Sequence, residues 1–253
     1  MIYDEAPELY DAQYLAYRDD LPFYLRLADD HGPKILELGA GSGRVTESLA
    51  RAGHQVVALD ASAAMMSRAR ERLAGAGLEQ RSEFLLGDMC DFELPQRFSL
   101  VIAPFNTLMH AYGLDDQDRT LACVRRHLEP GGVFAFDLYV PRFAQLGVLR
   151  SEPSLPGGDP RNAAAGSRSD LFLIQRDDPE RQILTTTYYL DEASPDGTLK
   201  RSVSTLRQRY YTRFEIERAL RAAGFTLKLY GGFDRSRLSA DSHHFVGVAR
   251  LQG

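Results

Sequence analysis

Three closely spaced glycines and two acids are the residues of this chain whose types and spacing could do chemistry. Gly39, Gly41 and Gly43 follow an apolar run that contains Glu37. Because glycine has no side chain, backbone N–H groups in such a turn can closely approach a bound molecule. Asp60 follows about 20 residues later, where nucleotide-binding folds place the acid that binds the ribose hydroxyls. This arrangement predicts a nucleotide site.

Two strands and a helix are expected to position these residues. The segments 35–38 and 55–59 are rich in Ile, Leu and Val, which is typical of buried parallel strands, and residues 45–51 are expected to form a helix. Parallel strands end at one edge of their sheet, where open α/β folds bind ligands. We therefore expect Asp60 to lie opposite the glycine turn.

The glycine spacing and Glu37 distinguish the possible nucleotides. The turn has the form G-x-G-x-G, whereas a dinucleotide pyrophosphate usually binds to G-x-G-x-x-G. A carboxylate at Glu37 would repel a pyrophosphate but can accept from, or order water around, a cationic amino-acid group. The expected ligand has a ribose and a cationic amino acid and lacks phosphate, which describes S-adenosylmethionine (SAM).

Residues 36–43, Leu-Glu-Leu-Gly-Ala-Gly-Ser-Gly, resemble the first motif of the class I SAM-dependent methyltransferases. Asp88 with Met89 resembles the third motif of that family, and residues 128–132 match its Leu-x-Pro-Gly-Gly signature. The resemblance covers residues 34–140 and, to a lesser extent, 211–250, whereas the N-terminal helices and the insert match mainly the small-molecule N-methyltransferases of that family, with weaker motifs. It implies SAM as cofactor, S-adenosylhomocysteine (SAH) as product, and no metal.

The expected cofactor site combines the glycine turn with the ends of neighbouring strands. Asp60 would bind the ribose, and the Asp88 carboxylate would accept from the adenine amine. Asp91 is the alternative acid and is expected to cap a turn. Met65 would pack in the core, contact the adenine, or do both. The expected cofactor-binding residues are Tyr14, Glu37, Gly39, Ala40, Gly41, Gly43, Asp60, Ala61, Met65, Asp88, Met89 and Phe105.

Candidate catalytic residues follow the expected strand 98–103. Methyltransferases that act on DNA bases or glutamine carry Asn/Asp-Pro-Pro-Tyr/Phe here, and the sequence Ala-Pro-Phe-Asn at 103–106 disfavours those substrates. Asn106 could cap the next helix or orient an acceptor. His110 could be structural or remove an acceptor proton near neutral pH.

The N-terminal segment Leu9-Tyr10-Asp11 with Tyr14 resembles the sugar-amine N-methyltransferases, in which a tyrosine closes over the methionine moiety. Tyr14 could have this role and assist catalysis, or it could be core filling. Arg209 could contact the substrate or lie on a solvated strand face. The candidate substrate-binding residues are Asn106, His110, Arg209, Arg235 and His243. The pair His243 and His244 lacks further ligands at metal spacing, so we expect no metal.

The expected fold is α/β: a Rossmann-like, seven-stranded mixed sheet with an antiparallel last strand, helices on both faces, and a small antiparallel β insert over the active site. Residues 1–33 would form a helical cap and 34–150 the SAM-binding core. Residues 151–210 would form a lid loop and β insert that cover the substrate. Residues 211–253 would add the last helix and a closing β-hairpin.

The amino-acid composition of the chain limits the kinds of molecule that it is expected to bind. The chain of 253 residues is 44% hydrophobic and 26% charged, which is ordinary for a soluble globular protein. A net charge of −5 argues against a nucleic-acid partner. No apolar run approaches the ~20 residues of a membrane span, and the acidic N-terminus does not resemble a signal peptide. The separated Cys90 and Cys123 fit a reducing cytoplasm, so we expect a cytoplasmic monomer or homodimer.

The expected function is SAM-dependent methyl transfer to a small molecule, at nitrogen rather than oxygen. An amine acceptor needs little more than a neutral lone pair and correct alignment, so a strong base is not required. One alternative is a SAM-binding regulatory or scaffold protein without catalysis. The other is an NAD-dependent oxidoreductase, which would share Asp60 but not the glycine spacing.

Overall fold

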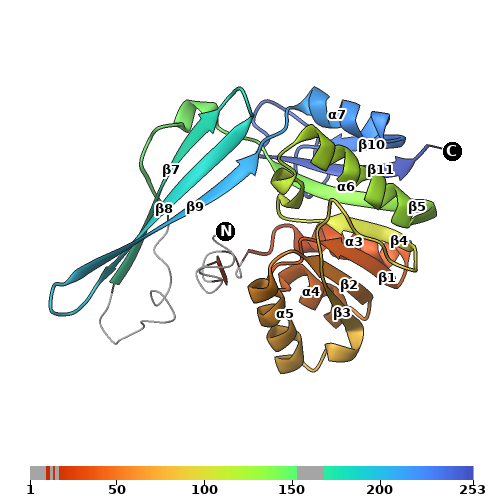
Figure 1. The fold of residues 1–253 in the computed structure, drawn as a ribbon, viewed down its shortest axis with the longest axis horizontal. Helices are drawn as coiled ribbons and strands as arrows, with labels where there is room; N and C mark the ends of the chain where they lie inside the picture. Colours follow the sequence, from red (N-terminus) through yellow and green to blue (C-terminus); the bar gives the residue numbers. More distant parts are fainter. Residues whose placement is uncertain (1–9, 12–13, 15–16, 153–167, 253) are drawn as a thin grey trace. The chain divides into compact units, whose positions relative to one another are not determined.

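The computed structural model describes residues 10–11, 14, 17–152 and 168–252, which form two compact units (Figure 1). The larger unit comprises residues 18–140 and 210–252. The smaller unit comprises residues 141–152 and 168–209 with the described residues before 18. The domain boundaries expected from the sequence stay a prediction.

The larger unit is built on a seven-stranded sheet in the order β10-β11-β5-β4-β1-β2-β3. Strands β1 to β5 run parallel, and β11 runs antiparallel to both of its neighbours. This confirms the expected mixed sheet with an antiparallel last strand. The bounds are β1 Lys34–Leu38, β2 Gln55–Asp60, β3 Ser82–Leu86, β4 Phe98–Ala103, β5 Leu128–Tyr139, β10 Phe225–Tyr230 and β11 His244–Leu251.

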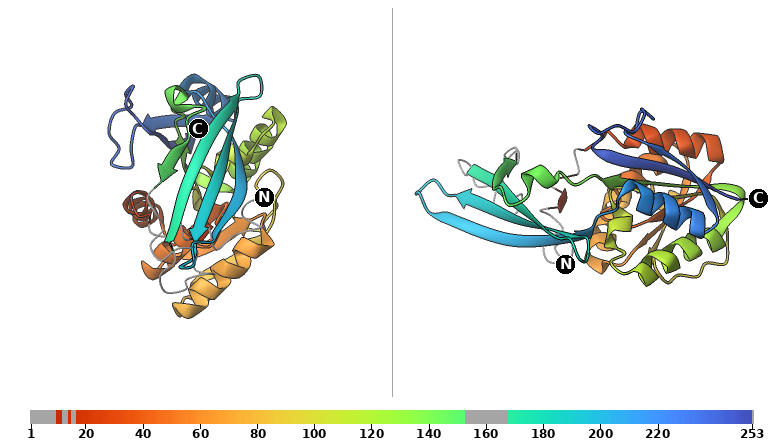
Figure 2. Two further views of the ribbon diagram at one scale, coloured as in Figure 1. Left: turned by 90° about the vertical axis from the view of Figure 1, so that its left-hand side faces the viewer. Right: turned by 90° about the horizontal axis from the view of Figure 1, so that it is seen from above.

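Helices cover both faces of this sheet: α3 lies on one face, and α6 and α7 lie on the other (Figure 2). Two of the helices begin as their sequences indicate. The Ser62 hydroxyl accepts from the N–H of Met65 at 3.2 Å, and the Glu215 carboxylate accepts from the N–H of Thr212 at 3.2 Å. The bounds are α3 Leu21–His31, α4 Arg44–Arg51, α5 Ala63–Gly75, α6 Leu114–His127 and α7 Arg213–Ala222, with short 3₁₀ turns η1 Glu79–Arg81 and η2 Thr107–His110.

The core lies where the central strands are covered on both faces. Ile35, Leu36 and Leu38 of β1 are fully buried, which explains why this strand is a continuous apolar run rather than an alternating one. Residues 129–132 of the Leu-x-Pro-Gly-Gly signature belong to β5, whose pairing with β4 shifts register between Phe98 and Leu100. The glycines allow this irregularity, since Gly131 has φ +80°.

The smaller unit holds a four-stranded antiparallel sheet in the order β6-β7-β8-β9. Buried and half-buried positions alternate along β8, as expected from the sequence. The strand β6 was not predicted from the sequence, because three residues in a segment without periodicity leave no signal. The bounds are β6 Arg150–Glu152, β7 Arg168–Asp178, β8 Ile183–Ala193 and β9 Leu199–Arg209, with a 3₁₀ turn η3 Phe143–Gln145.

Among the helices that the structure describes, none is long and apolar enough to cross a membrane.

Candidate active site

The glycine turn joins β1 to α4 with a backbone that requires glycine. Gly39, Gly41 and Gly43 have φ values of +64°, +57° and +82°, in the left-handed region that disfavours other residues. A Cβ at residue 39 would also overlap the side chain of Thr107 in η2. The turn that follows β1 and the turn that follows β4 therefore pack directly against each other.

Asp60 lies opposite the glycine turn at the end of β2, as expected. Its carboxylate accepts from the backbone N–H of Gly41 at 2.7 Å and from that of Ser62 at 2.8 Å. Next to it, Ala61 is exposed, whereas Ala40 is buried and donates its N–H to the Leu59 carbonyl at 3.2 Å. These hydrogen bonds fix the carboxylate beside the turn, where a ribose-binding acid is required.

In the turn after β3, Asp88 is exposed and Met89 is half-buried. The Asp88 carboxylate accepts from the N–H of Cys90 at 2.8 Å, so the acid that caps this turn is Asp88 rather than the expected Asp91, whose side chain is exposed. Met65 of α5 is buried, and its methyl carbon would lie 3.4 Å from a Cβ placed on Gly41. Met65 therefore packs in the core and also reaches the glycine turn.

Glu37 is an acid buried inside β1. It is 1% exposed, and its carboxyl group accepts from the Thr46 hydroxyl at 2.6 Å. Burial raises the pKa of Glu37 to about 8, although the Thr46 hydrogen bond and Arg44 oppose the shift. The group is therefore largely protonated at neutral pH in the unliganded protein. Contact between Glu37 and the cofactor stays a prediction.

An ion pair not predicted from the sequence lies beside the glycine turn. Arg44, the first residue of α4, donates to both carboxylate oxygens of Asp20 at 2.7 and 2.5 Å. The two side chains are only 9% and 0% exposed. The Arg44 guanidinium also lies 5.2 Å from the centroid of the Phe105 ring. The pair thus connects the segment before α3 to the turn after β4.

A second buried acid, Asp137 of β5, holds that turn from the other side. One of its oxygens accepts from the Tyr24 hydroxyl at 2.6 Å and from the N–H of Phe105 at 2.8 Å. Burial raises the pKa of Asp137 to about 6. The sequence contained the same signal as for Glu37, an acid within an apolar strand, and we did not predict a role for Asp137.

Phe105 and Asn106 are successive non-glycine residues with left-handed φ values of +55° and +66°. Such conformations cost about 1–3 kcal/mol each and persist where surrounding contacts fix them. Here Asp137 holds Phe105, and the Asn106 side-chain oxygen accepts from the N–H of Tyr139 at 2.5 Å. The expectation of a helix cap is wrong, because this side chain bonds to β5 instead of to η2.

His110 lies at the end of η2 and is half-buried. Burial lowers the pKa of this imidazole to about 4, and its Nδ1 lies 3.5 Å from the Tyr112 hydroxyl. The imidazole is therefore neutral at physiological pH and is a weaker base than an ordinary histidine, although it can still accept a hydrogen bond.

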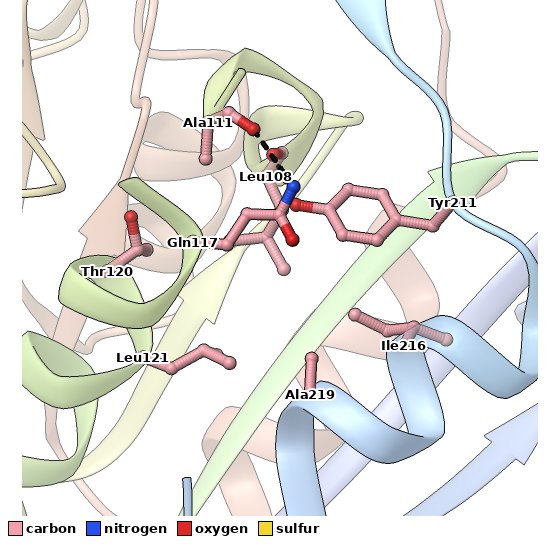
Figure 3. Close-up of a pocket in the computed structure, with 8 residues that line it drawn as sticks. All are labelled: Leu108, Ala111, Gln117, Thr120, Leu121, Tyr211, Ile216 and Ala219. Atoms are coloured by element: carbon pink, nitrogen blue, oxygen red, sulfur yellow. Dashed lines mark hydrogen bonds between the residues drawn. The ribbon is translucent and has the colours of Figure 1, made fainter. Parts of the chain in front are cut away.

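The inner side of η2 rests on side chains of α6 and on the segment before α7. The Tyr211 hydroxyl donates to the Leu108 carbonyl at 3.2 Å, and the Gln117 amide donates to the Ala111 carbonyl at 3.4 Å (Figure 3). The cavity between them measures about 10 Å³, room for no more than one water molecule. It supports η2 and is too small for a substrate.

Four candidates remain, two in each unit: Tyr14 and Arg209 in the smaller one, and Arg235 and His243 in the larger one. In the smaller unit, the Tyr14 hydroxyl lies 3.1 Å from that of Tyr188, and Arg209 donates to the Gln182 side chain at 2.9 Å. Arg209 is 6% exposed, so a solvated strand face is the wrong interpretation. In the larger unit, Arg235 and His243 lie in the β10–β11 loop, whose His243 carbonyl accepts from the N–H of Val140 at 2.9 Å. Within the described part of the chain, no group of three His, Cys, Asp or Glu residues could hold a metal.

Residues 35–132 match a family described as a methyltransferase domain. The chain is 34% identical over 193 residues to an uncharacterised methyltransferase of Geobacillus kaustophilus, with 73% of this chain and 77% of the relative covered. It is 26% identical over 236 residues to the dTDP-3-amino-3,6-dideoxy-alpha-D-glucopyranose N,N-dimethyltransferase of Streptomyces fradiae, with 90% and 86% covered. The solved CcbJ methyltransferase of Streptomyces caelestis superposes with a TM-score of 0.83 at 25% identity, covering 100% of this chain and 99% of that one.

Proposed function

Because this chain belongs to the SAM-dependent methyltransferases, we propose that it transfers the methyl group of SAM to an amine on a small, sugar-like acceptor. The observation that carries the proposal is the Asp60 carboxylate held against the glycine turn by the N–H groups of Gly41 and Ser62. A relative matched over nearly its whole length, at 26% identity, is named as an amino-sugar N,N-dimethyltransferase, which supports nitrogen as the acceptor atom.

The residues present fit the cofactor. The turn presents backbone without side chains at Gly39, Gly41 and Gly43, which suits a ligand that contacts backbone there. Asp60 would accept from the ribose hydroxyls, and Asp88 and Met89 would bind the adenine. Glu37 would lie near the ammonium group of the methionine moiety. When bound, SAM supplies an electrophilic methyl group on a sulfonium.

The protein's contribution to the transfer is to position the acceptor and to exclude water. The turn held by Asp137, Arg44 and Asn106 provides a fixed surface at the carboxyl end of β4. His110, neutral because of its burial, would accept a hydrogen bond from the acceptor amine and orient it, whereas the proton that an ammonium acceptor must lose would pass to water. Tyr14 would exclude water from the site.

The test is methyl transfer from labelled SAM to matched pairs of acceptors. Purified full-length chain is incubated with amino sugars, free and linked to a nucleoside diphosphate, and with the same sugars bearing a hydroxyl in place of the amine. Label should appear only on the amines. Transfer confined to the hydroxyl compounds would refute nitrogen as the acceptor atom, and failure to bind SAM or SAH would refute the function.

A further inference from the structure

A second cleft, of about 420 Å³, lies where the end of β10, the β10–β11 loop and the start of α7 meet. Three of its lining residues are arginines, and none of the described lining residues is an acid. The cleft is lined by Arg213, Leu229, Tyr230, Arg235, Arg237 and Leu238. All of them belong to the larger unit.

The charges of this cleft are only weakly compensated. Arg213 pairs with Glu217 one helical turn away at 2.9 Å, and its side chain is 53% exposed, so the pair contributes little. Arg235 places its guanidinium 5.8 Å from the centroid of the buried Phe23 ring, which restricts its orientation without neutralising it. Asp234 is adjacent in sequence, but its carboxylate accepts from the N–H of Ser236 at 3.0 Å. Guanidinium groups that line one cleft repel each other unless an anion lies between them.

The backbone of Arg235 supplies an independent observation. Its φ is +63°, a left-handed conformation that is unfavourable for a residue other than glycine. The N–H of Arg235 donates to the Gly232 carbonyl at 3.0 Å, and the N–H of Gly231 donates to the Ser236 carbonyl at 2.9 Å, so a closed turn fixes this conformation. The fold therefore holds an arginine side chain at a position whose backbone favours glycine, and strain of this kind is concentrated at functional sites.

We propose that this cleft binds a phosphate or diphosphate group, and that the group is the anionic end of the methyl acceptor. Arginine forms paired hydrogen bonds to phosphate oxygens, and the Tyr230 hydroxyl adds another donor. The β10–β11 loop is tied to the end of β5 by the 2.9 Å bond from Val140 to His243, so the cleft and η2 share one edge of the sheet. The assignment to the acceptor rests on the proposed function, whereas the anion site does not.

The test titrates inorganic pyrophosphate into the full chain without SAM and measures heat. Arg237→Gln and Arg235→Gly each remove one charge from the cleft, and the glycine also removes the backbone strain, so neither should unfold the protein. Arg218→Gln is the matched control, because Arg218 is an exposed residue of α7 outside the cleft. We expect the Kd for pyrophosphate to rise about tenfold in each cleft variant, as for the loss of one charge-assisted hydrogen bond, and to be unchanged in the control. Equal affinity in all four proteins, or no binding to wild type, would overturn the proposal.

Two further measurements separate this inference from the proposed function. SAH is titrated into the same proteins. SAH binding without pyrophosphate binding refutes the anion site alone, and the reverse refutes the proposed function alone. Pyrophosphate is then added to the methyl-transfer assay. Inhibition that competes with the acceptor supports a shared ligand, whereas inhibition independent of acceptor concentration overturns that assignment and indicates a separate phosphorylated ligand.

Discussion

The carboxyl edge of the sheet has two halves, in which the acidic side chains accept hydrogen bonds from different kinds of donor. At the ends of β2 and β3, Asp60 is half-buried and Asp88 is exposed, and both accept mainly from backbone N–H groups close in sequence. At the ends of β4 and β5 and around α4, Asp20 and Asp137 are buried and are held by Arg44, Tyr24 and Phe105, which lie 24 to 113 residues away. The first half is organised by local turns, and the second depends on the completed fold.

The acids of the two halves have different roles, one in ligand binding and the other in stabilising the fold. Backbone donors around Asp60 can form as soon as β1 and β2 pair, and they leave the carboxylate near the surface where a ligand can reach it. The buried acids instead stabilise an unfavourable turn at Phe105 and Asn106, at the cost of desolvating charged groups. We therefore expect substitutions in the first half to change ligand affinity and substitutions in the second half to change stability.

The largest expected loss of stability comes from breaking the Asp20–Arg44 ion pair. Arg44→Ala should lower the free energy of unfolding by about 3–5 kcal/mol, because it leaves a buried carboxylate without its partner. Arg51→Ala is the matched control in the same helix, since Arg51 forms an exposed i,i+4 pair with Glu47 that contributes about 0.5 kcal/mol or less. Urea unfolding of both variants measures the difference. Equal losses would show that burial of the first pair is unimportant.

Glu37 provides a test that depends on pH. Its folded-state pKa of about 8 lies above the ordinary 4.5, so between these values the folded protein keeps a proton that the unfolded chain releases. The free energy of unfolding should therefore fall as pH rises through this range, by at most about 1.4 kcal/mol per pH unit for this group. Glu37→Gln should remove this loss between pH 6 and 8, and Glu129→Gln, at an exposed position, should keep it. Parallel stability curves for the three proteins would contradict the burial effect.

Release of the Glu37 proton on cofactor binding would also show whether Glu37 lies near the cofactor. A cationic ammonium brought close to this carboxyl group would lower its pKa, so SAM binding at pH 7 should release up to one proton. Calorimetry in buffers with different ionisation enthalpies measures that release. Glu37→Gln should abolish it while still binding SAM. Binding by wild type without proton release would place the ammonium group elsewhere.

In the half organised by local turns, Asp60→Asn should mainly weaken ligand binding. The amide keeps only one acceptor oxygen where the carboxylate now serves two N–H groups and, as predicted, the ribose. We expect the Kd for SAH to rise about tenfold to a hundredfold, or about 1.4–2.7 kcal/mol. Asp91→Asn, exposed in the neighbouring turn, should leave the affinity unchanged. The same weakening in both variants would indicate a general charge effect and not a ribose contact.

Features organised by local sequence could be predicted, whereas contacts that depend on the completed fold could not. The glycine turn and the parallel strands depend on neighbours in sequence or on periodicity, and each was predicted. The contacts of Asp137 with Tyr24 and of Asp20 with Arg44 join distant segments, and no local pattern shows which acid meets which partner. Asn106 illustrates the limit, since its type and position suit a helix cap, but the strand β5 that pairs beside it offers a better donor at Tyr139.

The smallest expected effect concerns His110, at the point where the two halves meet in η2. With its pKa lowered to about 4, the imidazole stays neutral above that pH, so kcat/KM should show no inflection near 6.5 that depends on His110. His110→Gln should lower kcat by less than about tenfold, because an amine acceptor can lose its proton to water before it binds. Wild type and variant are compared from pH 5 to 9, with Thr107→Ser as a control in the same turn. An inflection near pH 6.5 in the kcat/KM of wild type that is absent from the variant would contradict the lowered pKa of His110 in the free enzyme.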